Sequence, residues 1–165
     1  NRFYFVHPDG AVQHYDKKHL FTFGGEHKRF TAGTERVVVN FRGVRILLEV
    51  CYDLRFPVWS RNLGDYDMIL YVASWPTPRV DAWSALLRAR AIENQCYVAG
   101  VNRMGTDPAC EYSGGSAIID PYGKTIAECP WSRESAVSAD IDMEALQAFR
   151  KKFPVLDDAD PFTLI

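Results

Sequence analysis

Alternating and clustered hydrophobic positions along the chain predict a mixed α/β fold. Apolar residues that alternate with polar ones are typical of strands with one buried face, whereas continuous apolar runs are typical of strands buried on both faces. A mostly apolar run, residues 44–50, leads directly into a cysteine, and we expect this strand to be buried on at least one face. The predicted strands cover residues 2–6, 11–15, 36–41, 44–50, 66–73, 96–101, 116–119, 125–128 and 136–141.

Three segments show the features of helices. Residues 81–95 carry apolar side chains at helical spacing, with Asp81 as the expected N-cap. Residues 57–63 predict a short helix with a proline in its first turn. Residues 142–152 predict a third helix that Asp142 caps. The apolar positions of the longest helix are Ala82, Leu86, Ala89 and either Ala91 or Ile92.

Turn residues connect several of the predicted strands. Proline and glycine in residues 7–10 and 120–123 predict two hairpins, one near each end of the chain. Residues 102–113 are expected to form a loop. Because no repeat or linker interrupts the pattern, the order of elements indicates a single α/β domain over residues 1–165, with a largely buried central sheet.

Composition and charge narrow the classes of function. Hydrophobic residues make up 47% and charged residues 24% of the chain, and the formal net charge is −2 without a basic block. These values argue against a nucleic-acid or membrane-surface partner, and no apolar run is long enough to span a bilayer. The cysteines show neither a CxxC pair nor a metal-ligand spacing, so we expect no metal site and reduced thiols in a cytoplasm. They are Cys51, Cys96, Cys110 and Cys129.

The strongest chemical signal lies where the strand at residues 44–50 ends at Cys51. A strand end followed by a sharp turn holds a side chain at the edge of a sheet, where α/β folds commonly bind ligands. We expect the backbone N–H groups of Tyr52 and Asp53 to point into the same space. A thiol beside N–H donors suits acyl transfer. The alternative is an inert core cysteine, because free cysteine is among the most buried residue types.

Three stretches together resemble the nitrilase superfamily, the carbon–nitrogen hydrolases. Residues 15–21 are similar to its lysine motif, residues 49–57 to its cysteine motif, and residues 88–95 with the following strand to its downstream signature. They read Tyr-Asp-Lys-Lys-His-Leu-Phe, Glu-Val-Cys-Tyr-Asp-Leu-Arg-Phe-Pro and Arg-Ala-Arg-Ala-Ile-Glu-Asn-Gln. The resemblance covers essentially the whole chain and implies an αββα sandwich.

The resemblance also implies a Glu-Lys-Cys triad that needs no cofactor. Cys51 would be the nucleophile and Lys17, rather than Lys18, the catalytic lysine. A nearby ammonium favours the thiolate and, with the N–H of Tyr52, would hold the oxyanion that forms on attack at an amide carbon. Loss of ammonia would leave a thioester, which water then hydrolyses.

One part of the family pattern has no counterpart in these residues. The triad glutamate of the family lies in its N-terminal part, after the first strand and helix, so the chain looks like the C-terminal two-thirds of a member. We therefore expect a natural protein that begins upstream, with its general base outside this sequence. Among the carboxylates present, the resemblance gives Glu26 a positioning role near the active site; the alternative is an exposed loop charge.

Arg55 and two tryptophans are candidates for the substrate pocket. Arg55 lies close to the nucleophile and would either bind a substrate carboxylate or, as we expect, pair with a buried carboxylate such as Glu93. Trp75 and Trp83 either line the pocket or pack in the core.

Two further polar residues have structural interpretations. Asp53 is expected to fix the turn after Cys51 through local hydrogen bonds. His19 is structural in the matched motif, although a Cys-His hydrolase on another fold is an alternative that a close contact between His19 and Cys51 would favour.

Within the superfamily, several stretches look closest to the omega-amidase branch. They are residues 53–61, 74–76 and 26–33. This resemblance implies hydrolysis of the terminal amide of small 2-oxo acids such as 2-oxoglutaramate. Nitriles, N-carbamoyl compounds and other linear amides are alternative substrates, and a non-catalytic binding subunit is an alternative function.

The family resemblance also implies a homo-oligomer, a dimer or larger. We expect its interface to include residues 57–63 and the C-terminal tail, whose apolar end is residues 162–165.

Overall fold

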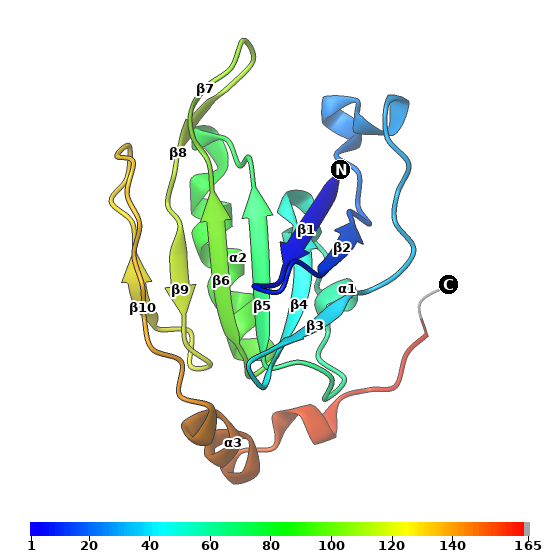
Figure 1. Ribbon diagram of the computed structural model, residues 1–165, viewed down its shortest axis with the longest axis vertical. Helices are drawn as coiled ribbons and strands as arrows, with labels where there is room; N and C mark the ends of the chain where they lie inside the picture. Colours follow the sequence, from blue (N-terminus) through cyan, green and yellow to red (C-terminus); the bar gives the residue numbers. More distant parts are fainter. Residues whose placement is uncertain (164–165) are drawn as a thin grey trace.

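A mixed six-stranded β-sheet forms the centre of the computed structural model, which describes residues 1–163 (Figure 1). The strand order is β10-β9-β6-β5-β4-β3, with β4, β5 and β6 parallel to one another and the outer strands antiparallel to their neighbours. The strands are β3 (Val38–Phe41), β4 (Val44–Val50), β5 (Met68–Ala73), β6 (Tyr97–Asn102), β9 (Ala117–Ile119) and β10 (Thr125–Glu128).

The three parallel strands end at the same edge of the sheet. Val50 of β4 pairs with Val72 of β5, and Ala73 of β5 pairs with Asn102 of β6. The residues that follow these strands, among them Cys51 and Ser74, therefore meet at this edge. This is the position at which α/β sheets commonly hold their ligands.

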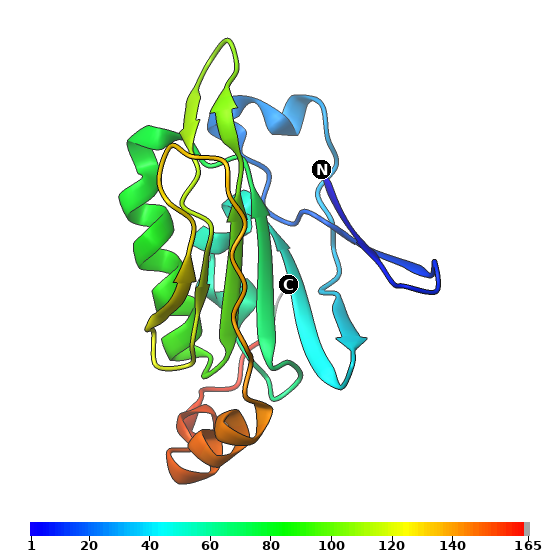
Figure 2. The ribbon, with the colours of Figure 1, turned by 60° about the vertical axis from the view of Figure 1, so that its left-hand side comes forward.

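Helix α2 (Val80–Glu93) covers one face of the sheet (Figure 2). Gly100 of β6 allows the close approach, because a Cβ there would lie 2.6 Å from Leu87 and 2.7 Å from Trp83. The main hydrophobic core lies between this helix and the sheet. It includes Leu47, Ile69, Tyr71, Trp83, Leu87, Ala91 and Val98.

The predicted helix at 81–95 is confirmed, and so is its apolar face in part, because Ala91 is buried and Ala82 and Leu86 pack against the core, but the predicted cap is wrong. Arg79 is the N-cap, so Asp81 lies in the first turn instead of before it. The buried helical residues are Trp83, Leu87, Arg90 and Ala91, whereas Ile92 is 53% exposed. Arg90 is buried because its guanidinium donates to Leu54 O and to Glu93, which a count of apolar positions does not reveal.

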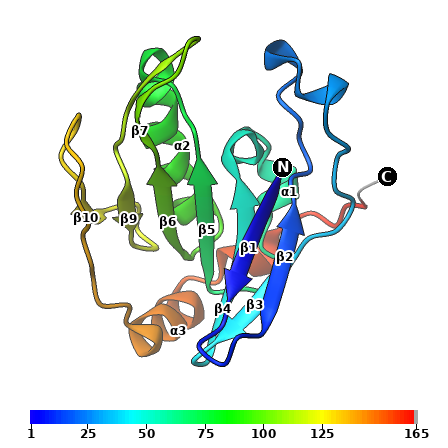
Figure 3. The same ribbon diagram turned by 45° about the horizontal axis from the view of Figure 1, so that its top comes forward.

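The opposite face of the sheet carries the hairpin of β1 (Arg2–Val6) and β2 (Val12–Asp16), which forms a two-stranded sheet of its own (Figure 3). Phe3 and Tyr15 of the hairpin pack with Leu48 of β4 in a second core. The described residues thus form a helical layer and two sheet layers, which confirms the α/β prediction.

Helix α3 (Met143–Lys152) lies beyond the end of the sheet opposite the Cys51 edge (Figure 1). The Asp142 side chain accepts a 2.8 Å hydrogen bond from Ala145 N, as predicted for an N-cap. Leu146 is buried in the second core and anchors the helix.

Three segments differ from the sequence-based prediction. Helix α1 (Pro57–Ser60) ends before residue 63, because Asn62 instead hydrogen-bonds to the end of α2 through Asn94. The loop predicted at 102–113 contains a hairpin of β7 (Met104–Thr106) and β8 (Glu111–Ser113). Residues 136–141 form no strand, since most of their side chains are exposed and the segment has no buried face to define one.

Short 3-10 helices complete the structure. They are η1 (Thr22–Gly24), η2 (Glu26–Lys28), η3 (Cys51–Arg55), η4 (Thr77–Arg79) and η5 (Val155–Asp158). No helix among residues 1–163 is both long and apolar enough to cross a bilayer. Leu164 and Ile165, the end of the predicted interface tail, lie outside the described residues.

Candidate active site

Cys51 is held in a backbone conformation that few side chains adopt. It is the first residue of η3, directly after β4, and its φ is 48°. Left-handed backbone at a residue other than glycine costs on the order of 1–3 kcal/mol and persists only where surrounding contacts enforce it. Asp53 provides one such contact, because its Oδ2 accepts a 3.1 Å hydrogen bond from Val50 N. This bond confirms the expected local role of Asp53 in the turn.

A cleft of about 490 Å³ opens at the Cys51 edge of the sheet. It brings together most of the residues that the sequence predicts for catalysis or substrate binding, although they come from separate parts of the chain. These are Lys17, Glu26, Cys51, Tyr52, Arg55 and Trp75.

Lys17 is buried in this cleft and paired with a carboxylate. Its side chain is 2% exposed, and its Nζ donates to both oxygens of Glu26, at 2.9 and 2.7 Å. Glu26 Oε2 also accepts a 2.9 Å hydrogen bond from Phe21 N. The carboxylate thereby fixes the position of the ammonium group, so Glu26 is not an isolated loop charge.

Two opposing influences act on the Cys51 thiol. Burial raises its pKa above the ordinary value, and the positive charge of Lys17 opposes that rise. The thiol lies 3.9 Å from the carbonyl oxygen of Ser74, to which it can donate. Because the thiolate is the nucleophilic form, reaction at neutral pH requires a base that removes this proton.

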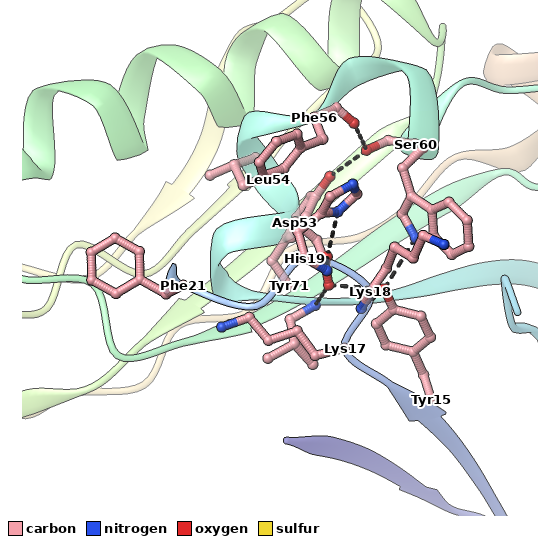
Figure 4. Close-up of polar contacts among 12 residues, drawn as sticks. Tyr15, Lys17, Lys18, His19, Phe21, Asp53, Leu54, Phe56, Ser60 and Tyr71 are labelled. Atoms are coloured by element: carbon pink, nitrogen blue, oxygen red, sulfur yellow. Dashed lines mark hydrogen bonds and ion pairs between the residues drawn. The ribbon is translucent and has the colours of Figure 1, made fainter. Parts of the chain in front are cut away.

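A buried carboxylate joins the lysine segment to the cysteine turn (Figure 4). Asp53 Oδ1 accepts hydrogen bonds from His19 N and His19 Nδ1, both 2.8 Å long. Asp53 Oδ2 accepts from Tyr15 OH at 2.8 Å, and this hydroxyl in turn accepts from Trp59 Nε1 at 3.0 Å. These bonds fix the segment that carries Lys17 against the turn that carries Cys51.

The same contacts give His19 a structural position. Its ring stacks on Phe56 at a centroid distance of 3.8 Å, and it does not line the cleft. The contact that would favour a Cys-His pair is therefore not found, since Lys17 shares the cleft with Cys51 and His19 does not.

The expected ion pair of Arg55 with Glu93 is wrong. Glu93 pairs with Arg90 at 2.8 Å, because these two residues lie one turn apart on α2. The Arg55 guanidinium instead lies over the ring of Trp75, 4.9 Å from its centroid. Trp83 packs in the core against Trp75 rather than lining the cleft.

Sequence reasoning missed several residues of the cleft wall. Phe21, Arg79, Cys110 and Tyr112 line it as well. The stiff Trp-Pro-Thr-Pro-Arg stretch before α2 is a usable signal for Arg79. Tyr112 lies in the β7–β8 hairpin, where the sequence predicts only a loop. No cluster of three or more histidine, cysteine or acidic side chains within residues 1–163 is arranged to hold a metal ion.

Comparison with known proteins places this geometry in a family. The family model for carbon-nitrogen hydrolases matches residues 1–151. The chain is 55% identical over 165 residues to omega-amidase YafV of Escherichia coli strain K12, covering 99% of this chain and 64% of that protein. It is 40% identical over 161 residues to 2-oxoglutaramate amidase of Bacillus subtilis strain 168, covering 96% of this chain and 62% of that protein. The chain thus spans slightly less than two-thirds of the length of these curated relatives.

A solved structure agrees with the sequence relatives. A CN-hydrolase superfamily protein from Xanthomonas campestris, which carries an arsenic adduct in its active site, superposes with a TM-score of 0.96 at 48% identity. The match covers 99% of this chain and 65% of that one. The fold, the family match and these relatives together show that the chain belongs to the carbon-nitrogen hydrolase family.

Proposed function

We propose that this chain supplies the nucleophile and the lysine of an amidohydrolase of the omega-amidase type. Its substrate would be a small 2-oxo acid with a terminal amide, and its products ammonia and a 2-oxo dicarboxylate. The observation that carries the proposal is the shared cleft of Cys51 and the Glu26-paired Lys17. The omega-amidase and 2-oxoglutaramate amidase relatives support this choice of substrate.

In the proposed reaction, the Cys51 sulfur attacks the amide carbon. The carbonyl oxygen becomes an oxyanion, which the Lys17 ammonium and the N–H of Tyr52 stabilise. The C–N bond then breaks, ammonia leaves with the thiol proton, and a thioester remains on Cys51. Water hydrolyses the thioester, releases the acid and restores the thiol.

Glu26 has a positioning role in this scheme, because its oxygens are occupied by Lys17 Nζ and Phe21 N. The proton acceptor, as the family resemblance implies, is a glutamate outside these residues. Residues 1–165 would then be the C-terminal two-thirds of the catalytic domain.

Ammonia release tests the proposal. The complete natural protein should release ammonia from 2-oxoglutaramate, and Cys51→Ala should abolish turnover and the mass increase of the trapped thioester. Cys129→Ser is the matched control, because Cys129 is buried away from the cleft and should leave turnover intact. Turnover that survives Cys51→Ala would reject the mechanism. Failure to release ammonia from any amide, nitrile or N-carbamoyl compound would favour a binding subunit.

The protein is further proposed to act in the cytoplasm as a homodimer or larger oligomer. All four cysteines are free thiols, which fits a reducing compartment. Val58, Leu63 and Phe162 are 53%, 65% and 43% exposed on the surface around α1, where we expect a second copy to bind. Light scattering at micromolar concentration should give at least twice the mass of one chain; a single-chain mass would reject the oligomer.

A further inference from the structure

The cleft has more positive than negative charge on its side chains. Its charged side chains are Lys17, Glu26, Arg55 and Arg79. Lys17 and Glu26 neutralise each other in their ion pair. Within residues 1–163, neither Arg55 nor Arg79 forms a hydrogen bond or ion pair through its guanidinium. The guanidinium groups of Arg55 and Arg79 are therefore two positive charges in the cleft that can bind an anion.

Both guanidinium groups lie over aromatic rings. Arg55 lies over Trp75 at 4.9 Å, and Arg79 lies over Phe21 at 5.6 Å, measured to the ring centroids. An aromatic face holds a guanidinium by cation–π attraction and leaves its five N–H donors available. The Phe21 ring is also 5.0 Å from that of Tyr52, the residue after the nucleophile. Phe21 thus connects Arg79 to Tyr52 along the wall of the cleft.

The segment that carries Arg79 is firmly anchored. The indole N–H of Trp75 donates to Arg79 O at 2.7 Å. The Trp75 backbone is in turn bonded to Asn102, with Trp75 N donating to Oδ1 at 2.7 Å and Nδ2 donating to Trp75 O at 3.1 Å. Two prolines stiffen the intervening residues. Such a preorganised cation loses little freedom when it binds a ligand.

We propose that Arg79 is a specificity-determining residue that binds the carboxylate at the end of the substrate opposite its amide. The assignment rests on the proposed amidase function. A guanidinium suits this task because its fork of donors matches a carboxylate in two parallel hydrogen bonds.

Two amides of equal length provide the kinetic test in the complete natural protein. Succinamate carries a carboxylate where butyramide carries a methyl group, and otherwise the two chains match. Arg79→Gln should lower the ratio of kcat/KM for succinamate over butyramide by about tenfold or more, mainly through KM for succinamate. Arg79→Lys keeps the charge without the fork and should restore part of the ratio. Arg88→Gln, an exposed arginine on α2 outside the cleft, should leave the ratio unchanged.

Binding of succinate separates this inference from the proposed function. In the Cys51→Ala background, calorimetry should show succinate binding that Arg79→Gln weakens by about tenfold, whether or not any amide is hydrolysed. An unchanged selectivity ratio, or equal succinate affinity with and without Arg79, would overturn the assignment. Thermal melting of each variant shows whether it is folded, and Arg79→Lys replaces Arg79→Gln if the latter unfolds.

Discussion

Burial of Cys51, the proposed nucleophile, works against the ionisation of its thiol. Burial raises the pKa of the thiol, and the ammonium of Lys17 is the main positive charge that opposes this effect. The Glu26 carboxylate holds Lys17 in place but also partly offsets its charge at the sulfur. The reactivity of this thiol therefore depends on keeping Lys17 in the cleft.

Replacing the lysine should make the thiol less reactive. Without the positive charge of Lys17, the pKa of Cys51 rises further, so Lys17→Met should slow alkylation of Cys51 by iodoacetamide roughly three- to tenfold between about pH 7 and 9. Peptide mass spectrometry follows Cys51 separately from Cys110. Lys18→Met is the matched control, since Lys18 Nζ lies over the Trp59 ring rather than in the cleft. Equal rates in Lys17→Met and wild type would contradict this account.

At the residue level, the sequence predicts motif residues better than their partners. The order of the lysine and cysteine motifs was sufficient to nominate Lys17 and Cys51, which the fold brings into one cleft. The predicted partner of Arg55 was wrong because a long guanidinium side chain can reach several groups. Only the folded structure decides between Glu93 and the face of Trp75. Arg79 belongs to no motif, and its place in the cleft likewise depends on tertiary contacts.

At the level of elements, Asp53 connects the segment after β2 to the turn after β4. Asp53→Asn should lower the free energy of unfolding by about 1–3 kcal/mol, because the amide cannot accept from all the N–H and O–H donors of His19, Tyr15 and Val50. Urea denaturation measures the loss.

The control for Asp53 is an aspartate with a local role only. Asp9 accepts one hydrogen bond from Ala11 N in the exposed turn of the first hairpin, so Asp9→Asn should change stability by less than about 0.5 kcal/mol. A loss for Asp53→Asn no larger than this would show that the two segments are held together by packing alone.

Helix α3 depends on its N-cap. Asp142→Ala removes the acceptor for Ala145 N and should cost about 1 kcal/mol of stability in urea denaturation. Asp140→Ala, two residues earlier and exposed, should have almost no effect. If both variants unfold at the same urea concentration, the cap does not stabilise the protein.

Elements with a local cause were predictable, and those with a tertiary cause were not. Strand β4 is mostly apolar and β-branched, and α3 has its own cap, so both were confirmed within a residue. Helix α1 ends early because Asn62 bonds to Asn94, which lies far along the chain. The β7–β8 hairpin depends on Asp107, whose Oδ1 accepts hydrogen bonds from Ala109 N and Cys110 N. Asp107 is a turn signal, but the polar composition of the segment favours a loop in the sequence-based prediction.

At the level of the whole molecule, two buried carboxyl groups respond to pH in opposite directions. Asp67 joins the start of β5 to β4 and α3 through Arg45 and Arg150. Burial opposes its ionisation, but hydrogen bonds from Arg45 and Arg150 outweigh burial and lower its pKa. Its contribution to stability is present above the pKa of an unfolded aspartate, about 3.9, and is lost as pH falls through the folded value.

The contribution of Glu49, within β4, to stability changes with pH in the opposite direction to that of Asp67. Its side chain is 0% exposed, and neither carboxyl oxygen has a hydrogen-bond partner among the described residues. Burial and the nearby charge of Asp53 raise its pKa well above the ordinary value, and Arg36 and Arg90 offset only part of this rise. Above about pH 4.3 the folded protein therefore keeps a proton here that the unfolded chain has already released.

This difference predicts how stability varies with pH. The contribution of Glu49 is complete below the pKa of an unfolded glutamate, about 4.3, and falls by about 1.4 kcal/mol per pH unit as pH rises toward its raised folded value. Glu49→Gln cannot titrate, so it should flatten the decline in the free energy of unfolding from mildly acidic to neutral pH. Urea denaturation at several pH values measures the slope, with Glu128→Gln, an exposed glutamate, as the control. A slope equal to that of wild type would mean that Glu49 is ionised in the folded protein, with Arg36 and Arg90 compensating its charge.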